Sequence, residues 1–395
     1  MDRKTKYCVG IYFGQEYTSV SRVPGYNGQN ISNIPLRRRG RLTDYKINSS
    51  ISIDKEGRQR FVYSKLDCIN SESCVRFTYP ISALGQQQKE LFCEFAKLIF
   101  DSILANDSDL VYDEKKGYSN FVICISCPDG WEQHNYNYNE EYLKFFKEDC
   151  GIIPAQICID ESISLLYATC KELDYSGSVV NINIDSQITS LSTFQNLRRV
   201  KECCMNIDVG TNMLDEILIF EGWKNGMNIK GIEAAEALRR YEGLDSMEKY
   251  LTFAIRKARL NYFLNNKEYY ECYLRFRELV PVPFPLNYKA FSLCLSKLEF
   301  DHITERFEKL LNKYFKEAAQ CLSKHGIIPD IISLFGEAAL IPFIKNLVNS
   351  SFPDAIIYCP ILSISDGAAI YLKKQLELTS ERTTDPKQKK SIVPR

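Results

Sequence analysis

Several short stretches of the chain combine glycine with β-forming residues in a way that suits phosphate binding. The first is Val9 to Ser21, VGIYFGQEYTSVS, in which an alternating apolar pattern stops at Gly14 and resumes after Tyr17. This pattern predicts a hairpin with a tight turn, where glycine lets backbone N–H groups approach a ligand such as phosphate. A related pattern, VVNINIDSQITSLS, returns at Val179 to Ser192. Two such hairpins, each followed by a mixed segment, predict a duplicated architecture with a cleft between the halves.

A further candidate anion site follows the second hairpin, where Asp208-Val209-Gly210-Thr211 leads into an apolar helical pattern. Backbone N–H groups at such a helix start can bind an anion. Glu161 and Asp366 each stand at the start of a predicted helix, where a carboxylate also stabilises the helix dipole. For each glycine the alternative is that it only permits a turn, so both interpretations stay open.

The elements that must position these residues follow from the apolar periodicity. Helices are predicted at 86–104, 139–149, 161–173, 300–325, 341–349 and 367–376. Strands are predicted at 47–61, 120–126, 157–159, 198–207 and 330–335, with a strand pair near 268–279 that three prolines end. This order predicts an α/β protein with two lobes, residues 1–177 and 178–378, and a disordered tail at 379–395. The second lobe carries a helical insertion at about 231–325.

Composition and charge exclude several classes of protein. Lys+Arg and Asp+Glu both count 50 in 395 residues, so a neutral chain gives no electrostatic reason to expect nucleic acid or an anionic membrane as partner. No apolar run is long enough to cross a bilayer, and the charged N-terminus runs into the first strand rather than forming a signal peptide. The 15 cysteines lie mostly in apolar runs, which is typical of buried thiols in a reducing, cytoplasmic compartment.

The cysteines and histidines form no recognisable metal motif. Cys124 and Cys127 are spaced as CxxC, but they fall in a predicted strand, where residues three apart face opposite sides. His134, His302 and His325 are far apart in the sequence. We therefore expect free structural thiols, assign the histidines no catalytic role, and leave the metal ligands unassigned.

The order of segments resembles the nucleotide-binding domain of the seventy-kilodalton heat-shock chaperones, in the actin and sugar-kinase superfamily. The likeness runs from about Val9 to Lys374. It is carried by the two hairpins and by segments 47–65, 123–128, 158–167 (CIDESISLLY), 209–215, 296–301, 333–342 (SLFGEAALIP) and 365–371. The resemblance implies two lobes, each built on an RNase H-like mixed sheet flanked by helices, with a nucleotide-type cleft between them. It also implies ATP or ADP with magnesium as ligand, and we expect the family's peptide-binding domain to be missing.

The resemblance also implies the site residues. Phosphate contacts fall at Gly14, Gln15, Glu16, Tyr17, Asp185, Ser186, Gly210 and Thr211, adenosine contacts at Arg256, Arg259, Gly336, Glu337 and Asp366, and a catalytic carboxylate at Glu161.

The chain departs from the family pattern at the phosphate contacts. Tyr12 stands where the family has an aspartate that serves magnesium, and Asp185, Ser186 and Gln187 stand where it has three glycines. Glu16 would place a negative charge beside the phosphates, and a like-charge pair at ~4 Å costs about 4 kcal/mol in a partly screened site.

Three functional hypotheses follow. The first is a chaperone-like ATP-binding protein with a divergent site and weak or no ATPase activity. The second is a pseudo-enzyme that acts as a protein-interaction or regulatory module without nucleotide, and the lost charges and glycines favour it. The third is a sugar or small-metabolite kinase, for which the phosphate loops are not intact. A protein partner is expected under the second hypothesis.

Overall fold

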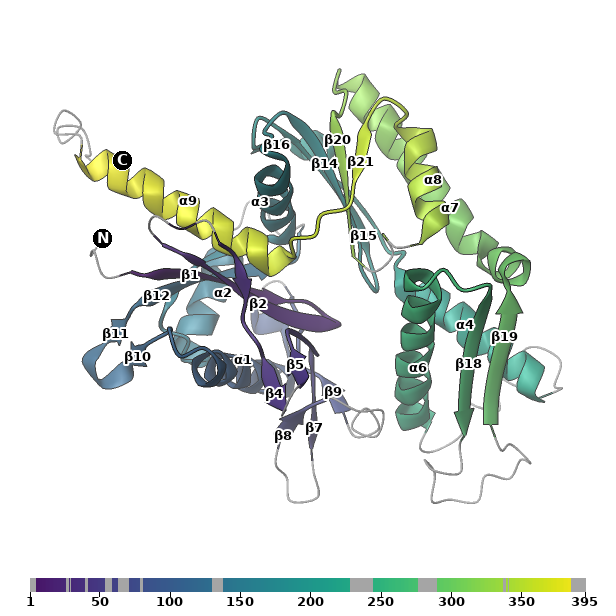
Figure 1. The fold of residues 1–395 in the computed structure, drawn as a ribbon, viewed down its shortest axis with the longest axis horizontal. Coiled ribbons are helices and arrows are strands. Elements are labelled where there is room, and N and C mark those ends of the chain that lie inside the picture. The colour runs from purple at the N-terminus through teal and green to yellow at the C-terminus, as the bar shows by residue number, and fades with distance from the viewer. Residues whose placement is uncertain are drawn as a thin grey trace. The chain divides into compact units, whose positions relative to one another are not determined.

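The computed structural model describes residues 5–25, 28, 30–39, 42–53, 59–62, 71–78, 81–129, 138–227, 244–275, 290–336, 339 and 341–384. The chain divides into two compact units. Unit 1 comprises Met1–Ile51, Ser73–Tyr175 and Pro360–Arg395, and unit 2 comprises Ser52–Glu72 and Ser176–Cys359. Mixed sheets flanked by helices are present in both units (Figure 1), so the predicted α/β class is confirmed. Among the described residues, no helix combines the length and apolarity needed to cross a bilayer.

The sheet of unit 1 is built around the first predicted hairpin. Its strands are β1 (Tyr7–Phe13), β2 (Tyr17–Pro24), β3 (Ser32–Asn33), β6 (Lys46–Asn48), β12 (Phe121–Cys127) and β13 (Ala155–Asp160). The order is β13-β12-β1-β2-β3, with β6 also paired to β2. Strand β1 is antiparallel to β2 and parallel to β12, and β12 is parallel to β13. The hairpin therefore occupies the centre, and the later parallel strands extend one side.

The sheet of unit 2 repeats this order with the second hairpin. Its strands are β14 (Ser178–Ile184), β15 (Thr189–Gln195), β16 (Arg198–Arg199), β17 (Met205–Ile207), β20 (Ile331–Phe335) and β21 (Ile356–Tyr358). The order is β16-β15-β14-β20-β21, with β17 also paired to β15. Strand β14 is antiparallel to β15 and parallel to β20, and β20 is parallel to β21. Both predicted hairpins are confirmed, and they hold equivalent places in the two sheets.

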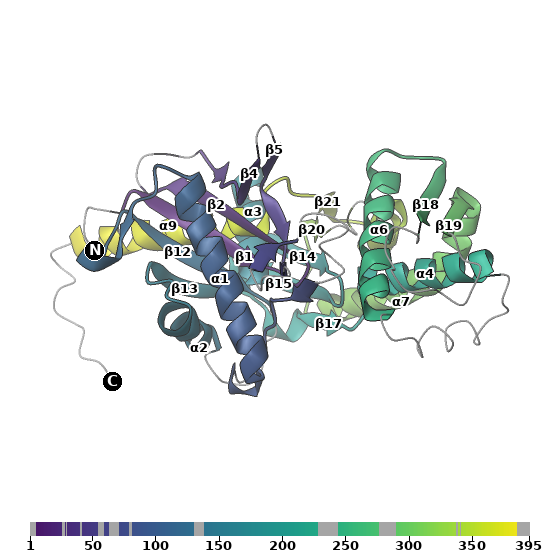
Figure 2. The ribbon, with the colours of Figure 1, turned by 90° about the horizontal axis from the view of Figure 1, so that it is seen from below.

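Helices cover both faces of the unit 1 sheet. They are α1 (Gln86–Asn106), α2 (Tyr138–Lys144, continued by a π-helical turn, Phe145–Asp149), α3 (Glu161–Leu173) and α9 (Ile364–Thr384). On one face the ring of Phe13 contacts the rings of Phe92 and Phe95 on α1. On the other face Cys8 packs with Ala368 of α9, and Figure 2 shows α1 and α9 on opposite sides of the strands. This division follows from the alternation of side chains along β1.

Unit 2 has two cores. Helices α7 (Lys297–Lys324) and α8 (Pro342–Ser351) cover the sheet, where Phe307 and Ile344 pack with Ile182. A second core joins α4 (Thr211–Met227) and α6 (Leu244–Leu264) to the strand pair β18 (Tyr269–Arg275) and β19 (Ala290–Ser296).

Three small sheets complete the described strands: β4 (Arg37–Arg39) with β5 (Leu42–Asp44); β7 (Ser50–Ile53) with β8 (Gln59–Phe61) and β9 (Ser71–Ser73); and β10 (Tyr112–Asp113) with β11 (Tyr118–Ser119).

The structure corrects several predicted elements. The segment 198–207 is not one strand, because a 3-10 turn at Lys201–Cys203 divides it into β16 and β17. Strand β18 pairs with β19, which follows the prolines, rather than with a strand before them. Helix α9 continues to Thr384, into the segment predicted to be disordered. Extending an existing helix is much easier than nucleating one, so its end does not require an apolar residue.

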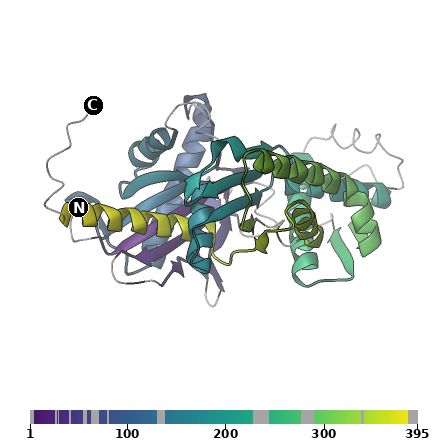
Figure 3. The ribbon, with the colours of Figure 1, turned by 90° about the horizontal axis from the view of Figure 1, so that it is seen from above.

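Helix α9 approaches the first strand of the chain very closely, and Figure 3 shows it crossing the strands of unit 1. A Cβ atom at Gly10 would lie 2.0 Å from the carbonyl oxygen of Ser365. The Ser365 hydroxyl also lies within hydrogen-bond distance of the hydroxyls of Ser19 (3.0 Å) and Ser21 (2.8 Å) on β2. The absence of a side chain at Gly10 thus determines how near α9 lies to the sheet.

We predict that Gly10→Ala destabilises the protein by about 1–3 kcal/mol or more, because the added methyl group meets backbone atoms that cannot rotate away. Gly85→Ala is the matched control, since a Cβ atom there meets nothing within 4 Å. The control is expected to cost less than about 1 kcal/mol at this helix N-cap position. The measurement is urea unfolding of both variants, and equal midpoints would contradict the close approach.

Candidate functional site

The two predicted phosphate turns have the same geometry. In the first, the N–H of Gly14 donates to the carbonyl of Tyr17 at 3.1 Å, and two residues, 15 and 16, form the turn. In the second, the N–H of Asp185 donates to the carbonyl of Ile188 at 3.0 Å, with residues 186 and 187 between them. Each turn is therefore closed by a hydrogen bond between a backbone N–H and a backbone carbonyl of the same predicted phosphate-binding segment.

The ring of Tyr12 fills the space beside Gly14. A Cβ atom at Gly14 would lie 2.6 Å from the Tyr12 ring and from its hydroxyl oxygen. Tyr12 is almost fully buried, and its ring meets the Tyr17 ring edge-on at a centroid distance of 5.5 Å. The absence of a side chain at Gly14 thus leaves room for the Tyr12 ring. Tyr12 itself stands where the resemblance implies an aspartate that serves magnesium.

Ser49, in the neighbouring strand segment, holds the first turn by hydrogen bonds. Its N–H donates to the carbonyl of Glu16 at 3.0 Å, and its hydroxyl donates to the carbonyl of Gly14. The hydroxyls of Ser49 and Thr18 are 2.9 Å apart, and both side chains are fully buried. Gln15, Glu16 and Tyr17, the other predicted phosphate contacts of this turn, are partly buried.

The second turn is bonded to the start of helix α4. The N–H of Thr211 donates to the carbonyl of Asp185 at 3.0 Å, and the N–H of Asn212 donates to the carbonyl of Ser186 at 2.8 Å. A Cβ atom at Gly210 would lie 2.3 Å from the Ser186 carbonyl oxygen. The structure thus brings these predicted phosphate residues together, but the helix-start N–H groups have carbonyl partners within the protein.

The Asp185 carboxylate acts within its own turn. Its Oδ1 accepts a hydrogen bond from the N–H of Ser186 at 2.8 Å. Burial raises the pKa of the Asp185 carboxyl, while the Ser186 N–H and the positive charge of Arg256 oppose this shift. A raised pKa means that the folded protein disfavours the charged carboxylate at this position.

Two predicted adenosine contacts, Arg256 and Arg259, belong to a buried ion-pair cluster. Arg259 Nε lies 3.0 Å from Oδ1 of Asp215 on α4, and Arg256 Nε lies 2.9 Å from Oδ2 of the same carboxylate. Arg256 also donates to the side chain of Asn212. Arg259 is 0% exposed, so stacking on a nucleobase would require it to leave Asp215. The cluster fastens α6 to the first turns of α4.

The remaining adenosine contacts differ in their surroundings. Gly336 has a φ angle of 84°, and a Cβ atom there would lie 2.4 Å from the carbonyl oxygen of Ile184. Glycine is thus needed where β20 ends beside β14, whatever ligand binds. Glu337 lies outside the described residues. The Asp366 carboxylate accepts bonds from the N–H and the hydroxyl of Ser363, both at 2.7 Å, which satisfies the start of α9.

Acidic groups gather where the parallel strands β12 and β13 end. Asp129 follows β12, and its Oδ1 accepts a hydrogen bond from the N–H of Ser162 at 3.2 Å. Asp160 ends β13, is fully buried, and accepts a bond from the Asn139 side chain at 3.2 Å. Glu161, the predicted catalytic carboxylate, opens α3 and is 7% exposed. The carboxyl edge of a parallel sheet is the usual ligand position in α/β proteins.

Asp129 and Asp160 were not among the residues predicted from the sequence to form a site. Asp160 is the N-cap of α3, but its side chain makes no cap hydrogen bond, and Asp129 makes that bond to Ser162 instead. The available signal was an acidic residue at or just beyond the end of a largely apolar strand, seen twice, after Cys127-Pro128 and after Ile159.

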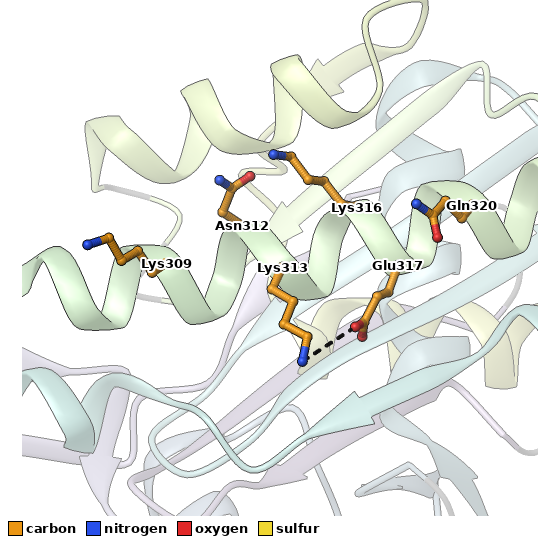
Figure 4. A pocket seen from close by; sticks show the side chains of 6 residues that line it. All are labelled: Lys309, Asn312, Lys313, Lys316, Glu317 and Gln320. Atoms are coloured by element: carbon orange, nitrogen blue, oxygen red, sulfur yellow. Dashed lines mark ion pairs between the residues drawn. The ribbon is translucent and has the colours of Figure 1, made fainter.

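A shallow surface depression lies along helix α7, away from the predicted residues. Figure 4 shows that its lining side chains all come from this one helix: Lys309, Asn312, Lys313, Lys316, Glu317 and Gln320. Lys313 and Glu317 form an exposed ion pair at 3.8 Å. A single helix face with solvated side chains encloses no ligand, so this depression supports no catalytic function.

We predict that Asp215→Asn destabilises the protein by about 3–5 kcal/mol, because it leaves two buried or half-buried arginines without their carboxylate. Glu317→Gln removes a carboxylate from an exposed pair and is the matched control, with an expected cost below about 1 kcal/mol. Chemical unfolding of both variants measures the difference. Similar small costs would show that the cluster contributes little.

We predict that Asp185→Asn flattens part of the pH dependence of stability. Since the folded pKa is raised, the free energy of unfolding falls as pH rises from about 4, the unfolded value, through the raised folded pKa. Asparagine keeps the oxygen that accepts from Ser186 but has no such titration. Unfolding of both proteins across this pH range should show the variant gaining stability relative to wild type as pH increases, whereas a constant difference would contradict the shift.

No protein-family model matches this chain, and no curated protein matches it. Its function therefore has to be inferred from the contacts described above.

Proposed function

We propose that this chain is a protein-binding member of the heat-shock-type ATPase fold that has lost ATP hydrolysis. One observation carries the proposal: the N–H groups of Thr211 and Asn212 donate to the carbonyls of Asp185 and Ser186. A phosphate at this helix start would have to displace two internal hydrogen bonds, each worth about 1 kcal/mol net. It would also have to separate the turn from Gly210, with which it is in close contact.

The strand order supports the proposed heat-shock-type ATPase fold. Each sheet has a central first strand, an antiparallel hairpin on one side and two parallel strands on the other. This is the order of the RNase H-like sheet that the resemblance implies. Helix α9, which carries the likeness at 365–371, packs on β1 of unit 1. A nucleotide-type cleft between two lobes is part of the proposal.

The first turn supports the loss of phosphate chemistry. The family's phosphoryl transfer depends on metal ligands and cations placed around the phosphates. Here the Tyr12 ring occupies the space beside Gly14, and Ser49 holds the carbonyls of the turn. A tyrosine ring supplies neither a metal ligand of the carboxylate type nor room for a phosphate oxygen.

Protein binding is supported by the outward side of strand β18. Tyr269 and Tyr273 are 52% and 60% exposed, and both alternate with the buried Tyr270 and Cys272 on the inner side. Tyrosine is enriched at protein interfaces, where it supplies apolar area and a hydroxyl. A peptide or protein surface is therefore the partner class that this strand suits.

A second candidate function keeps a magnesium–nucleotide complex in unit 1. Asp129, Asp160 and Glu161 offer carboxylate oxygens at the carboxyl edge of the parallel strands. Oxygen ligands of this kind are what Mg²⁺ prefers. A magnesium–nucleotide complex held at this edge would need little from the hairpin turns.

We predict that millimolar ATP or ADP, with or without magnesium, leaves the melting temperature of the full chain unchanged. A ligand at a hundred times its Kd would stabilise the fold by ~2.7 kcal/mol, which a thermal melt detects. A magnesium-dependent rise would overturn the proposal in favour of the second candidate. Glu161→Gln is then the deciding variant, because it should abolish the rise if the carboxylates hold the metal.

A further inference from the structure

Three side chains with metal-binding atoms meet where the end of helix α7 reaches the 3-10 turn Lys201–Cys203 in unit 2. The Sγ atoms of Cys203 and Cys321 are 4.0 Å apart. The Cys321 Sγ lies 3.9 Å from Nδ1 of His325. All three ligand atoms lie within 4.8 Å of one another. None of these residues belongs to the turns or the carboxylate edge discussed above.

Local structure explains why the chain places them together. Cys321 and His325 are four residues apart at the end of a helix, so they share one face. Cys203 is held in its turn by two hydrogen bonds: its N–H donates to the Val200 carbonyl at 3.1 Å, and its carbonyl accepts from the Thr193 hydroxyl at 2.9 Å. Two rigid elements therefore present the thiols to each other.

The spacing fits a tetrahedral zinc ion. Zn–S and Zn–N bonds of about 2.3 and 2.0–2.1 Å place two sulfur ligands ~3.8 Å apart, and a sulfur and a nitrogen ~3.6 Å apart. The observed 4.0 and 3.9 Å are close to these values. The sulfur atoms are too far apart for a disulfide, whose S–S bond is about 2.05 Å.

We propose that Cys203, Cys321 and His325 bind one zinc ion, with a water molecule or an external ligand in the fourth position. Binding releases the two thiol protons to solvent, so the ion is held by two thiolates and a neutral imidazole. His325 Nδ1 lies 2.9 Å from the Cys321 carbonyl and donates to it in the metal-free protein. Its proton is exchanged to Nε2 when Nδ1 becomes the ligand.

The surroundings suit a cation and allow it to enter. The site lies at the C-terminal end of a long helix, where the helix dipole favours positive charge. Cys203 is 1% exposed, whereas Cys321 is half-buried and His325 is exposed. A zinc ion can thus reach the outer two ligands first and the buried thiol last.

The test is titration of the reduced full chain with Co²⁺, which reports thiolate ligation through visible absorption, followed by displacement with Zn²⁺. We expect one Co²⁺ per chain with a thiolate-to-cobalt band. Cys321→Ser and His325→Ala should each weaken binding at least about tenfold. Both positions are accessible, which makes these variants safer than one at the buried Cys203.

Two matched controls should leave the cobalt spectrum unchanged: His302→Ala, an exposed histidine on the same helix, and Cys359→Ser, an exposed cysteine. Zn²⁺ should also raise the melting temperature of wild type and of both controls, but not of the two ligand variants. The proposal is overturned if no thiolate band appears, or if the band persists at full strength in both ligand variants.

Discussion

Helix α9 lies so close to strand β1 that only glycine fits at position 10, where a Cβ atom would meet the Ser365 carbonyl oxygen at 2.0 Å. The Ser365 hydroxyl lies beside the hydroxyls of Ser19 and Ser21, 346 and 344 positions earlier in the chain. The entropic cost of closing so long a loop grows only with the logarithm of its length, and burial of the α9 face, including Leu372, offsets it. Segments from near both ends of the chain therefore build one core in unit 1.

Close packing also governs unit 2, where it disfavours an anion site at the start of helix α4. Helix α4 begins against the second hairpin turn, and its first N–H groups are satisfied by the carbonyls of Asp185 and Ser186. Asp215 of α4 then neutralises Arg259, which is fully buried. Removing either member of such a pair leaves an uncompensated buried charge, so the arrangement is costly to open. A helix start that would be free to bind phosphate is instead part of the packing.

Much of the fold could be predicted from the sequence, since local patterns determine it. The alternation at the two hairpins and the apolar stripe of α1 identify their elements directly. The partner of β18 could not be predicted, because β19 lies beyond a long intervening segment. Arg259 was predicted to contact a ligand because the resemblance implies an adenosine contact there, and its buried pairing could not be predicted because its partner Asp215 lies 44 positions away. The spacing of Cys321 and His325 gave a local signal, but Cys203 is 118 positions distant.

A glycine at a predicted binding turn can make room either for a ligand or for neighbouring protein atoms. Only the atoms around it distinguish these two cases. Gly14 is covered by the Tyr12 ring, Gly210 by the Ser186 carbonyl, and Gly336 by the Ile184 carbonyl. In each case the missing side chain is replaced by protein atoms rather than by space for a ligand. Glycine spacing alone therefore does not distinguish a turn that binds phosphate from one whose space is filled by protein atoms. The carboxylates of Asp129 and Asp160 differ from the glycines, because each needs a donor when it is buried, and the N–H of Ser162 and the side chain of Asn139 supply one each. In unit 1 the carboxyl edge of the parallel strands thus keeps polar side chains at the usual ligand position of α/β proteins, whereas the first turn is filled by protein atoms.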